Sequence, residues 1–299
     1  AISLGTMGVE GDHTAKLAHT TPEPVTLHRV LAEAAAAGVT HAAMEASSHG
    51  LDQRRLDGVR VRAGAFTNFS QDHLDYHEGF DECFAAKRLL FDRILQPGDT
   101  AVINIDSDRG QQMAEIAVDG DLRLTAVGHD EACDLRILGQ RYDATGQDLR
   151  FSMDGRTHLV RLNLIGGFQA ENVLAAAGLC IASGDAPDRV LAALPGLTTV
   201  RGRMELAAVR ENGAAVFVDY AHKPGAVVAA LQSLRPHVMG RIVAVIGAGG
   251  YRVARGDLGV ADLVAFILYL FLLVMPLGGV LNAYTQLQMG LRALTRIEE

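Results

Sequence analysis

Helices and strands alternate along the first third of the chain, and this alternation restricts the fold more than any other feature. The pattern predicts a helix over Pro24–Ala37, a strand over Val39–Glu45 and a second strand over Val61–Phe69. A helix over Phe80–Leu95 and a strand over Thr100–Ile105 follow. A proline in the first turn and a glycine just past the end mark the first helix. The sequence therefore favours a layered α/β fold with a mostly parallel sheet flanked by helices.

The pattern changes twice further along the chain. Asp134–Ile165 has short alternating segments with glycines at turns, which predicts antiparallel strands, and Gln169–Ser183 is Ala-rich and helical. A new set of elements follows a boundary near residue 198: strands over 204–209, 215–220 and 242–246, and a helix from residue 224. We therefore expect domains at 1–198 and 199–250, the second a Rossmann-like domain of only about fifty residues, and a separate tail at 251–299.

The tail contains an apolar stretch, Leu263–Leu281, without a charged or strongly polar side chain. At ~1.5 Å per residue a helix of this length spans ~28 Å, about the thickness of a bilayer core. We predict a transmembrane helix and possible membrane contact; the alternative is a buried helix of a globular domain. Pro276 and the following glycine pair are tolerated in a membrane span. Arginines lie on both sides, so charge does not determine an orientation.

Composition limits the classes of partner. The chain has 299 residues, 49% of them hydrophobic, and a formal net charge of −8 without a basic cluster, which argues against nucleic-acid binding. Three widely spaced cysteines suit a reducing cytoplasm, and we expect them to be buried free thiols. Only three lysines occur, so chemistry that requires a lysine has few candidates.

Two segments gather groups that could hold a cation. Glu45 stands at the carboxyl end of a predicted strand, where open α/β sheets place ligands. The segment 68–77 collects two Asp and two His, His73 among them. Mg²⁺ prefers oxygen ligands and keeps several waters, so few protein groups suffice. The alternatives are a carboxylate that faces water and a capping loop rich in Asp and His.

Lys87 falls on the apolar side of its predicted helix, in helical spacing with Phe80, Phe84, Phe91 and Ile94. Burial disfavours the ammonium form, and a neutral amine can react with carbon dioxide to give a carbamate, which is an anionic oxygen ligand. The alternative is a lysine that packs its stem and extends its ammonium into water.

Five motifs in order resemble those of the Mur ligases, which join amino acids to UDP-muramoyl peptides. They are Met44-Glu45-Ala46-Ser47-Ser48-His49-Gly50-Leu51, Thr67-Asn68-Phe69-Ser70-Gln71-Asp72-His73-Leu74-Asp75-Tyr76-His77, Ala86-Lys87, Gly202-Arg203-Met204-Glu205 and Asp219-Tyr220-Ala221-His222-Lys223-Pro224. The spacing is most similar to the ligases that add meso-diaminopimelate or lysine to UDP-MurNAc-L-Ala-D-Glu. The resemblance covers about residues 2–250.

The resemblance implies roles for individual residues and a cytoplasmic location. It implies a carbamylated Lys87 that holds Mg²⁺ together with Glu45 and His73, with Lys87 and His73 serving catalysis. It also implies contacts of Thr20, Thr21, Ser47, Gln53, Arg55 and Arg252 with the substrates, a UDP-MurNAc-dipeptide and a diamino acid. Asn172, Arg203, Asp219 and Lys223 would line the ATP site. A substrate carboxylate would then attack the γ-phosphate of ATP, giving an acyl phosphate that the incoming amine displaces.

The sequence also departs from the family. The chain has no glycine-rich phosphate loop with Gly-Lys-Thr. Residues from Tyr251 onward do not match the family, which weakens the assignment of Arg252 to the substrate site. Residues 259–299 instead resemble the last transmembrane helix of an ABC-type exporter. We therefore expect a fragment of a ligase joined to a foreign tail, inactive alone. The alternatives are an enzyme whose phosphate loop comes from a partner, and a membrane-anchored module without catalytic activity.

Overall fold

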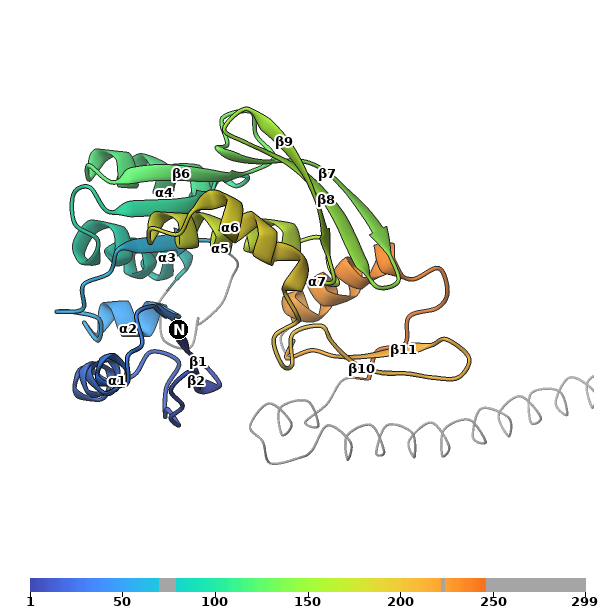
Figure 1. Ribbon diagram of the computed structural model, residues 1–299, viewed down its shortest axis with the longest axis horizontal. Helices are drawn as coiled ribbons and strands as arrows, with labels where there is room; N and C mark the ends of the chain where they lie inside the picture. The colour runs from blue at the N-terminus through green and yellow to red at the C-terminus, as the bar shows by residue number, and fades with distance from the viewer. Residues whose placement is uncertain (70–78, 222–223, 246–299) are drawn as a thin grey trace, which may run out of the picture. The chain divides into compact units, whose positions relative to one another are not determined.

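The computed structural model describes residues 1–69, 79–221 and 224–245 (Figure 1). The chain divides into two compact units, one of residues 1–198 and 232–240, the other of residues 199–231 and 241–299. The predicted membrane segment 263–281 lies outside the described residues. Among the residues that are described, no helix is both long and apolar enough to cross a membrane.

The first unit begins with a small three-stranded sheet. β1 (Ile2–Gly5) pairs antiparallel with β2 (Gly8–Gly11) and parallel with β3 (Ala42–Met44), so the strand order is β2-β1-β3. Helix α1 (Pro24–Ala36) buries Leu27, Val30 and Ala34 in the same apolar core as Ile2 and Leu4. Their spacing of three and four residues gives the helix one apolar face.

A six-stranded sheet forms the centre of the first unit, in the order β4-β5-β6-β7-β8-β9. The strands β4 (Ala63–Phe66), β5 (Thr100–Asn104), β6 (Arg123–Gly128) and the start of β7 (Leu135–Asp143) are parallel. The strands β7, β8 (Gly146–Met153) and β9 (Arg156–Leu162) form an antiparallel meander, as the alternating segments predicted. The expectation of a mostly parallel α/β fold is thus confirmed.

Helices cover both faces of this sheet (Figure 1). On β5, Ala101 and Ile103 face a core shared with α3 (Phe80–Leu89) and α4 (Asp108–Asp119), whereas Val102 faces a core shared with α5 (Gln169–Ala182). Successive side chains of a strand point to opposite faces, so a strand that is apolar throughout is buried between two layers. The remaining elements of this unit are α2 (Ser48–Asp52), α6 (Pro187–Ala193) and the single turn η2 (Leu194–Gly196).

Helix α3 changes its hydrogen bonding at its end. Residues Leu90–Ile94 form a π-helical turn, η1, and the amide of Leu95 donates to the carbonyl of Leu90 at 3.0 Å. The predicted helix over Phe80–Leu95 is therefore present, but its last turn is wider than an α-helical turn.

The second unit contributes one antiparallel pair, β10 (Glu205–Val209) and β11 (Ala215–Val218), followed by α7 (Pro224–Leu234). The short turn η3 (Arg235–His237) belongs to the stretch 232–240, which the division assigns to the first unit. The strand predicted over 242–246 is wrong for its described part, because residues 242–245 form no strand and pair with none of the described strands. A strand requires a partner for its backbone groups.

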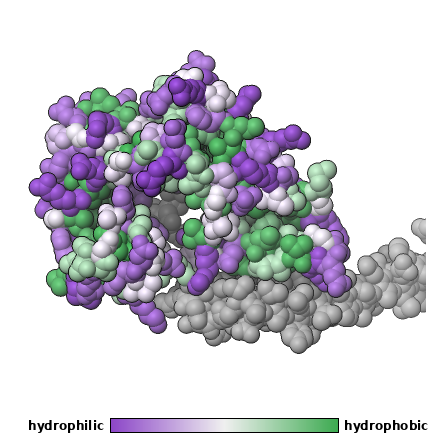
Figure 2. All heavy atoms as spheres, in the orientation of Figure 1, coloured by the Kyte–Doolittle hydropathy of each residue, from purple (hydrophilic) through white to green (hydrophobic). Residues whose placement is uncertain are grey.

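The surface of the protein and the burial of its three cysteines both bear on the predicted buried thiols. On the face shown in Figure 2, hydrophobic side chains are interspersed among hydrophilic ones. Cys83 and Cys133 are buried and free, whereas Cys180 is exposed, so the expectation of three buried thiols is wrong for the last. Cys180 is near the end of α5, beyond the buried residues of that helix that enter the core.

Candidate functional site

Glu45 lies where β1 and β3 end side by side. Its amide donates to the carbonyl of Leu4 at 3.0 Å, which continues the parallel pairing by one residue. Its carboxylate is exposed and lies so close to Gly5 that a side chain at that position would collide with Oε1. The Thr6 hydroxyl is 3.5 Å from Oε2, and the Thr20 hydroxyl is 3.2 Å from that of Thr6. Oxygen atoms therefore gather at the carboxyl ends of these strands.

The turn from β3 into α2 is held by two hydroxyl groups. Ser47 caps α2 by accepting a hydrogen bond from the amide of Gly50 at 3.1 Å. Thr21, only 1% exposed, donates to the carbonyl of Glu45 at 2.8 Å and accepts from the amide of Ser47 at 3.0 Å. The two hydroxyl oxygens, Thr21 Oγ1 and Ser47 Oγ, are also 3.0 Å apart.

Arg55 joins the same group of side chains from the segment after α2. Its Nη1 donates to the carbonyl of Thr21 at 2.8 Å, while Nε and Nη2 donate to Oε1 of Gln53 at 3.0 and 2.6 Å. Arg55 is half-buried and forms no ion pair with a carboxylate of the described residues. Its positive charge is thus held in place by neutral groups, which leaves it able to bind an anion.

Five residues that the resemblance assigned to the muramoyl substrate therefore lie together beside Glu45, linked by the contacts given above. They are Thr20, Thr21, Ser47, Gln53 and Arg55. Thr6 belongs to this group and was not found from the sequence. Thr6 directly follows β1, a strand of four residues that is too short to predict, and only the parallel pairing of β1 with β3 brings Thr6 beside Glu45.

Lys87 is half-buried on α3, as its place in the apolar pattern predicted. Its side chain has no hydrogen-bond or ion-pair partner within residues 1–69, 79–221 and 224–245. The helix is fixed to the segment around α2, because Arg93 in the adjoining turn donates to the carbonyl of Leu51 at 2.6 Å and pairs with Asp57 at 3.2 Å. His73, the third predicted metal ligand, lies outside the described residues.

Two predicted ATP-binding motifs meet in the second unit. The carboxylate of Asp219 accepts hydrogen bonds from the amides of Met204 and Ala221, both at 2.8 Å. Met204 is nearly buried and has a φ of 49°, a backbone conformation that is unfavourable for a residue other than glycine. Exposed Arg203 lies over the ring of Tyr220, 5.2 Å from its centroid. The motif around Arg203 is thereby fixed to the motif around Asp219.

Of the other residues predicted to bind ATP or the amino acid, only Asn172 is among the described residues. Asn172 is exposed in the first turn of α5, in the first unit, with its amide 3.5 Å from Oε1 of Gln169. Lys223 and Arg252 lie outside the described residues.

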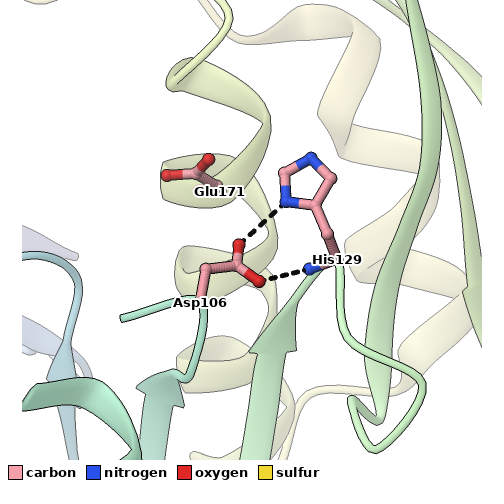
Figure 3. A group of neighbouring side chains, drawn as sticks. All are labelled: Asp106, His129 and Glu171. Carbon is pink, nitrogen blue, oxygen red and sulfur yellow. Dashed lines mark hydrogen bonds and ion pairs between the residues drawn. The ribbon is translucent and has the colours of Figure 1, made fainter. Parts of the chain in front are cut away.

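A second group of potential metal ligands was not found from the sequence: Asp106, His129 and Glu171 (Figure 3). Their ligand atoms lie within 4.8 Å of one another. Asp106 and His129 follow β5 and β6, two neighbouring parallel strands, and Glu171 is in the first turn of α5. Recognising them requires the strand order and the position of α5 against the sheet, because they are far apart in the sequence.

Within this group, the carboxylate of Asp106 already has partners. It accepts a hydrogen bond from the amide of His129 at 2.7 Å and lies 2.8 Å from Nδ1 of the same residue. Burial and the charge of Asp106 raise the pKa of the Glu171 carboxyl, while His129 opposes this shift. Burial, with Asp106 and Asp130, raises the pKa of the Cys133 thiol to about 11. The surroundings of Asp106 therefore disfavour further negative charge.

The segment that leads into α5 is organised by buried polar side chains. Gln147, fully buried, donates to the carbonyl of Gly166 at 2.8 Å, and Gln140 donates to the carbonyl of Gly167 at 2.7 Å. The amide of Gly166 donates to Nε2 of His237 at 3.0 Å. Nδ1 of His237 lies 2.7 Å from the carbonyl of Asp143, so this ring is neutral with its proton on Nδ1.

Comparison with known protein families gives two matches along the chain. Residues 2–180 match the Mur ligase middle domain, and residues 202–267 match the glutamate ligase domain of Mur ligases. The second match continues beyond Gly250, where the sequence resemblance was expected to end.

Curated proteins and solved structures agree with these matches. The UDP-N-acetylmuramoyl-L-alanyl-D-glutamate--2,6-diaminopimelate ligase of Bradyrhizobium diazoefficiens is 47% identical over 254 residues, which is 84% of this chain and 52% of that protein. The protein of the same name from Caulobacter vibrioides is 44% identical, over 84% of this chain and 53% of its own length. A solved structure of a ligase of that name has a TM-score of 0.70 at 28% identity, covering 86% of this chain and 54% of the other. The chain thus spans about half the length of the curated relatives it matches.

Proposed function

Because the chain belongs to the Mur ligase family, we propose that it carries part of an ATP-dependent ligase that adds a diamino acid, meso-diaminopimelate, to UDP-MurNAc-L-Ala-D-Glu. The observation that carries this proposal is the grouping of Thr20, Thr21, Ser47, Gln53 and Arg55 beside Glu45. The names of the relatives favour diaminopimelate over lysine as the amino acid.

In this proposal Arg55 binds an anionic group of the UDP-muramoyl dipeptide. Its guanidinium is held by two neutral oxygens, the Gln53 side chain and the Thr21 carbonyl, so no carboxylate of the described residues competes for it. Because the guanidinium group of Arg55 is already held in place, the side chain loses less conformational entropy when it binds the anion. Ser47 adds a half-buried hydroxyl at the start of α2.

Mg²⁺ fits the donor atoms at the other side of this group. Glu45 offers an exposed carboxylate, the hydroxyls of Thr6 and Thr20 lie beside it, and hard divalent cations prefer such oxygens. Lys87 supports a carbamate ligand, because it is half-buried and has no partner among the described residues. We propose Glu45, Lys87 and His73 as the residues that hold Mg²⁺, with Lys87 and His73 serving catalysis. The bound cation would reduce the repulsion between anionic reactants.

The reaction that we propose transfers a phosphoryl group and then forms an amide. A carboxylate oxygen of the substrate attacks the γ-phosphorus of ATP, the bond to the bridging oxygen breaks, and ADP leaves. The amine of the diamino acid then attacks the acyl carbon, loses a proton, and displaces inorganic phosphate. Arg203 and Asp219, with Asn172 and Lys223, are our proposed ATP-site residues, and ATP as co-substrate implies a cytoplasmic location. The contact of Arg252 with the incoming diamino acid stays a prediction.

Isothermal titration of the 299-residue chain with UDP-MurNAc-L-Ala-D-Glu tests the substrate site. We expect Arg55→Ala to weaken binding about tenfold or more, as for the loss of a charged hydrogen-bonding partner. Arg60→Ala is the matched control, because Arg60 is an exposed arginine near the same segment. Circular dichroism confirms that each variant is folded. Equal affinities of wild type and Arg55→Ala, or no binding by folded wild type, would contradict the proposal.

A further inference from the structure

The adjacent residues Thr20 and Thr21 differ sharply in their surroundings. The Thr21 side chain is buried, and its hydroxyl has three polar neighbours: the carbonyl of Glu45, the amide of Ser47 and the hydroxyl of Ser47, at 2.8, 3.0 and 3.0 Å. A hydroxyl has one proton to donate and two lone pairs to accept with. The proton of the Thr21 hydroxyl is taken by the Glu45 carbonyl and the Ser47 hydroxyl, and one lone pair by the Ser47 amide. Because the side chain is only 1% exposed, a ligand cannot reach what remains of this hydroxyl.

The rest of Thr21 is equally occupied. Its methyl group faces Gly50, where an added Cβ would lie 2.6 Å from Cγ2. Its carbonyl oxygen accepts the hydrogen bond from Nη1 of Arg55. Every polar contact of Thr21 thus leads to a residue of the proposed site, and the side chain itself is enclosed.

Thr20 has the opposite character. Its side chain is half-buried, and its hydroxyl is 3.2 Å from that of exposed Thr6. The Thr6 hydroxyl in turn points to Oε2 of Glu45, at 3.5 Å, which is too long for a strong hydrogen bond. These two hydroxyls therefore retain the capacity to bind a ligand or a coordinated water beside the Glu45 carboxylate.

We propose that Thr21 is a positioning residue, which acts through the backbone of Glu45 and Ser47, and that the hydroxyls of Thr20 and Thr6 are the groups that face the ligand. This inference rests on the proposed function. It reverses the expectation that both threonines contact the UDP-muramoyl dipeptide. The physical basis is that Thr21 fixes the carbonyl of Glu45 and the amide of Ser47 at once, and so sets the direction in which the Glu45 carboxylate and the Ser47 hydroxyl leave the turn.

Two substitutions of Thr21 separate its hydroxyl from its shape. Thr21→Val keeps the volume and removes the hydrogen bonds, whereas Thr21→Ser keeps the hydroxyl. We expect Thr21→Val to weaken Mn²⁺ binding, measured by electron paramagnetic resonance with Mn²⁺ as the probe for the Mg²⁺ site, by about tenfold or more. Binding of UDP-MurNAc-L-Ala-D-Glu, measured by calorimetry, should weaken in parallel. Thr21→Ser should restore both affinities to about the wild-type value.

Thr20→Val and Thr6→Val provide the contrast. Each removes an outward hydroxyl and should weaken dipeptide binding while leaving the exchange rate of the Ser47 amide unchanged. Thr21→Val should accelerate hydrogen exchange at that amide, because its acceptor is lost. Loss of dipeptide affinity in Thr21→Val with unchanged Mn²⁺ affinity and unchanged Ser47 exchange would overturn the inference in favour of a direct contact.

Two further outcomes also test the positioning role of Thr21. If Thr21→Val lowers the melting temperature but retains both affinities well below that temperature, the role of Thr21 is only structural and the inference is wrong. If folded wild type binds neither probe, the proposed function fails. In that case the Ser47 exchange rate still tests the positioning role: faster exchange in Thr21→Val supports it, and wild-type protection in that variant refutes it.

Discussion

Replacing His237 by phenylalanine should destabilise the first unit through two backbone groups that lose their partners. The imidazole joins the amide of Gly166, at 3.0 Å, to the carbonyl of Asp143, at 2.7 Å, and is itself only 6% exposed. Phenylalanine keeps a flat ring for the edge contact with Tyr142, whose centroid is 5.1 Å away. The substitution therefore removes hydrogen bonds while it largely preserves packing.

The magnitude follows from the burial of each partner. Gly166 is buried, so its amide cannot find water, and a buried donor without a partner costs about 1–3 kcal/mol. Asp143 is exposed, so its carbonyl can bind water at little cost. We expect a loss of about 2 kcal/mol, which corresponds to about 4–8 °C in melting temperature for a domain of this size.

Urea unfolding followed by circular dichroism measures this change, and hydrogen exchange at the Gly166 amide shows whether it arises there. His158→Phe is the matched control. Its ring stacks on Phe151, with centroids 5.1 Å apart, and its Nε2 is a buried atom without a partner. Removing that unpaired nitrogen should leave stability unchanged or slightly higher. An unfolding midpoint and Gly166 protection in His237→Phe equal to those of wild type would refute the reasoning.

Three further substitutions test other parts of the fold. Burial and the charge of Asp106 raise the pKa of Glu171, so the stability that this side chain contributes is present at acidic pH and is lost as the pH rises through the raised value. In urea titrations Glu171→Gln should therefore be more stable than wild type at pH 7 and equally stable at low pH. With Ellman's reagent the native chain should show one accessible thiol, absent in Cys180→Ser, because Cys83 and Cys133 are buried and Cys180 is exposed. Burial and the charge of Asp185 raise the pKa of Cys180, so this thiol should react more slowly than free cysteine; three reacting thiols in the native chain would contradict this. Gly50→Ala should lower the free energy of unfolding by about 1–3 kcal/mol, because the added Cβ would lie 2.6 Å from Cγ2 of Thr21. Gly196→Ala is the control, because nothing lies within 4 Å of a Cβ added there. Equal unfolding midpoints of the two variants would be inconsistent with this contact.

Signals that extend over a few neighbouring residues predicted the structure well. The helix that begins at Pro24, the antiparallel run of 134–165 and the helix from Gln169 are present close to their predicted limits. Each depends on a local rule: a proline in the first turn, alternation with glycine turns, or an Ala-rich stretch. The β1–β2 hairpin at Ile2–Gly11 was not predicted, because strands of four residues provide too little periodicity to identify.

Features that depend on distant contacts could not be predicted. Asp106, His129 and Glu171 meet only because β5 and β6 are neighbours and α5 covers them, and the sequence does not state the strand order. His237 reaches Asp143 and Gly166 from a segment more than seventy residues away in sequence. Its two ring nitrogens have opposite hydrogen-bonding roles there, and nothing in the residues beside it indicates either partner.

Thr20 and Thr21 have different surroundings, although the resemblance assigns both to the same substrate. The two threonines are neighbours in a bend of the chain, and yet Thr21 is buried whereas Thr20 is half-buried. Here the Thr21 hydroxyl is buried against Glu45 and Ser47, while the Thr20 hydroxyl is half-buried and retains the capacity to bind. A side chain that is enclosed by the protein can affect a ligand only by fixing other groups. The burial of each hydroxyl therefore supports our proposal that Thr20 faces the ligand and that Thr21 positions other groups.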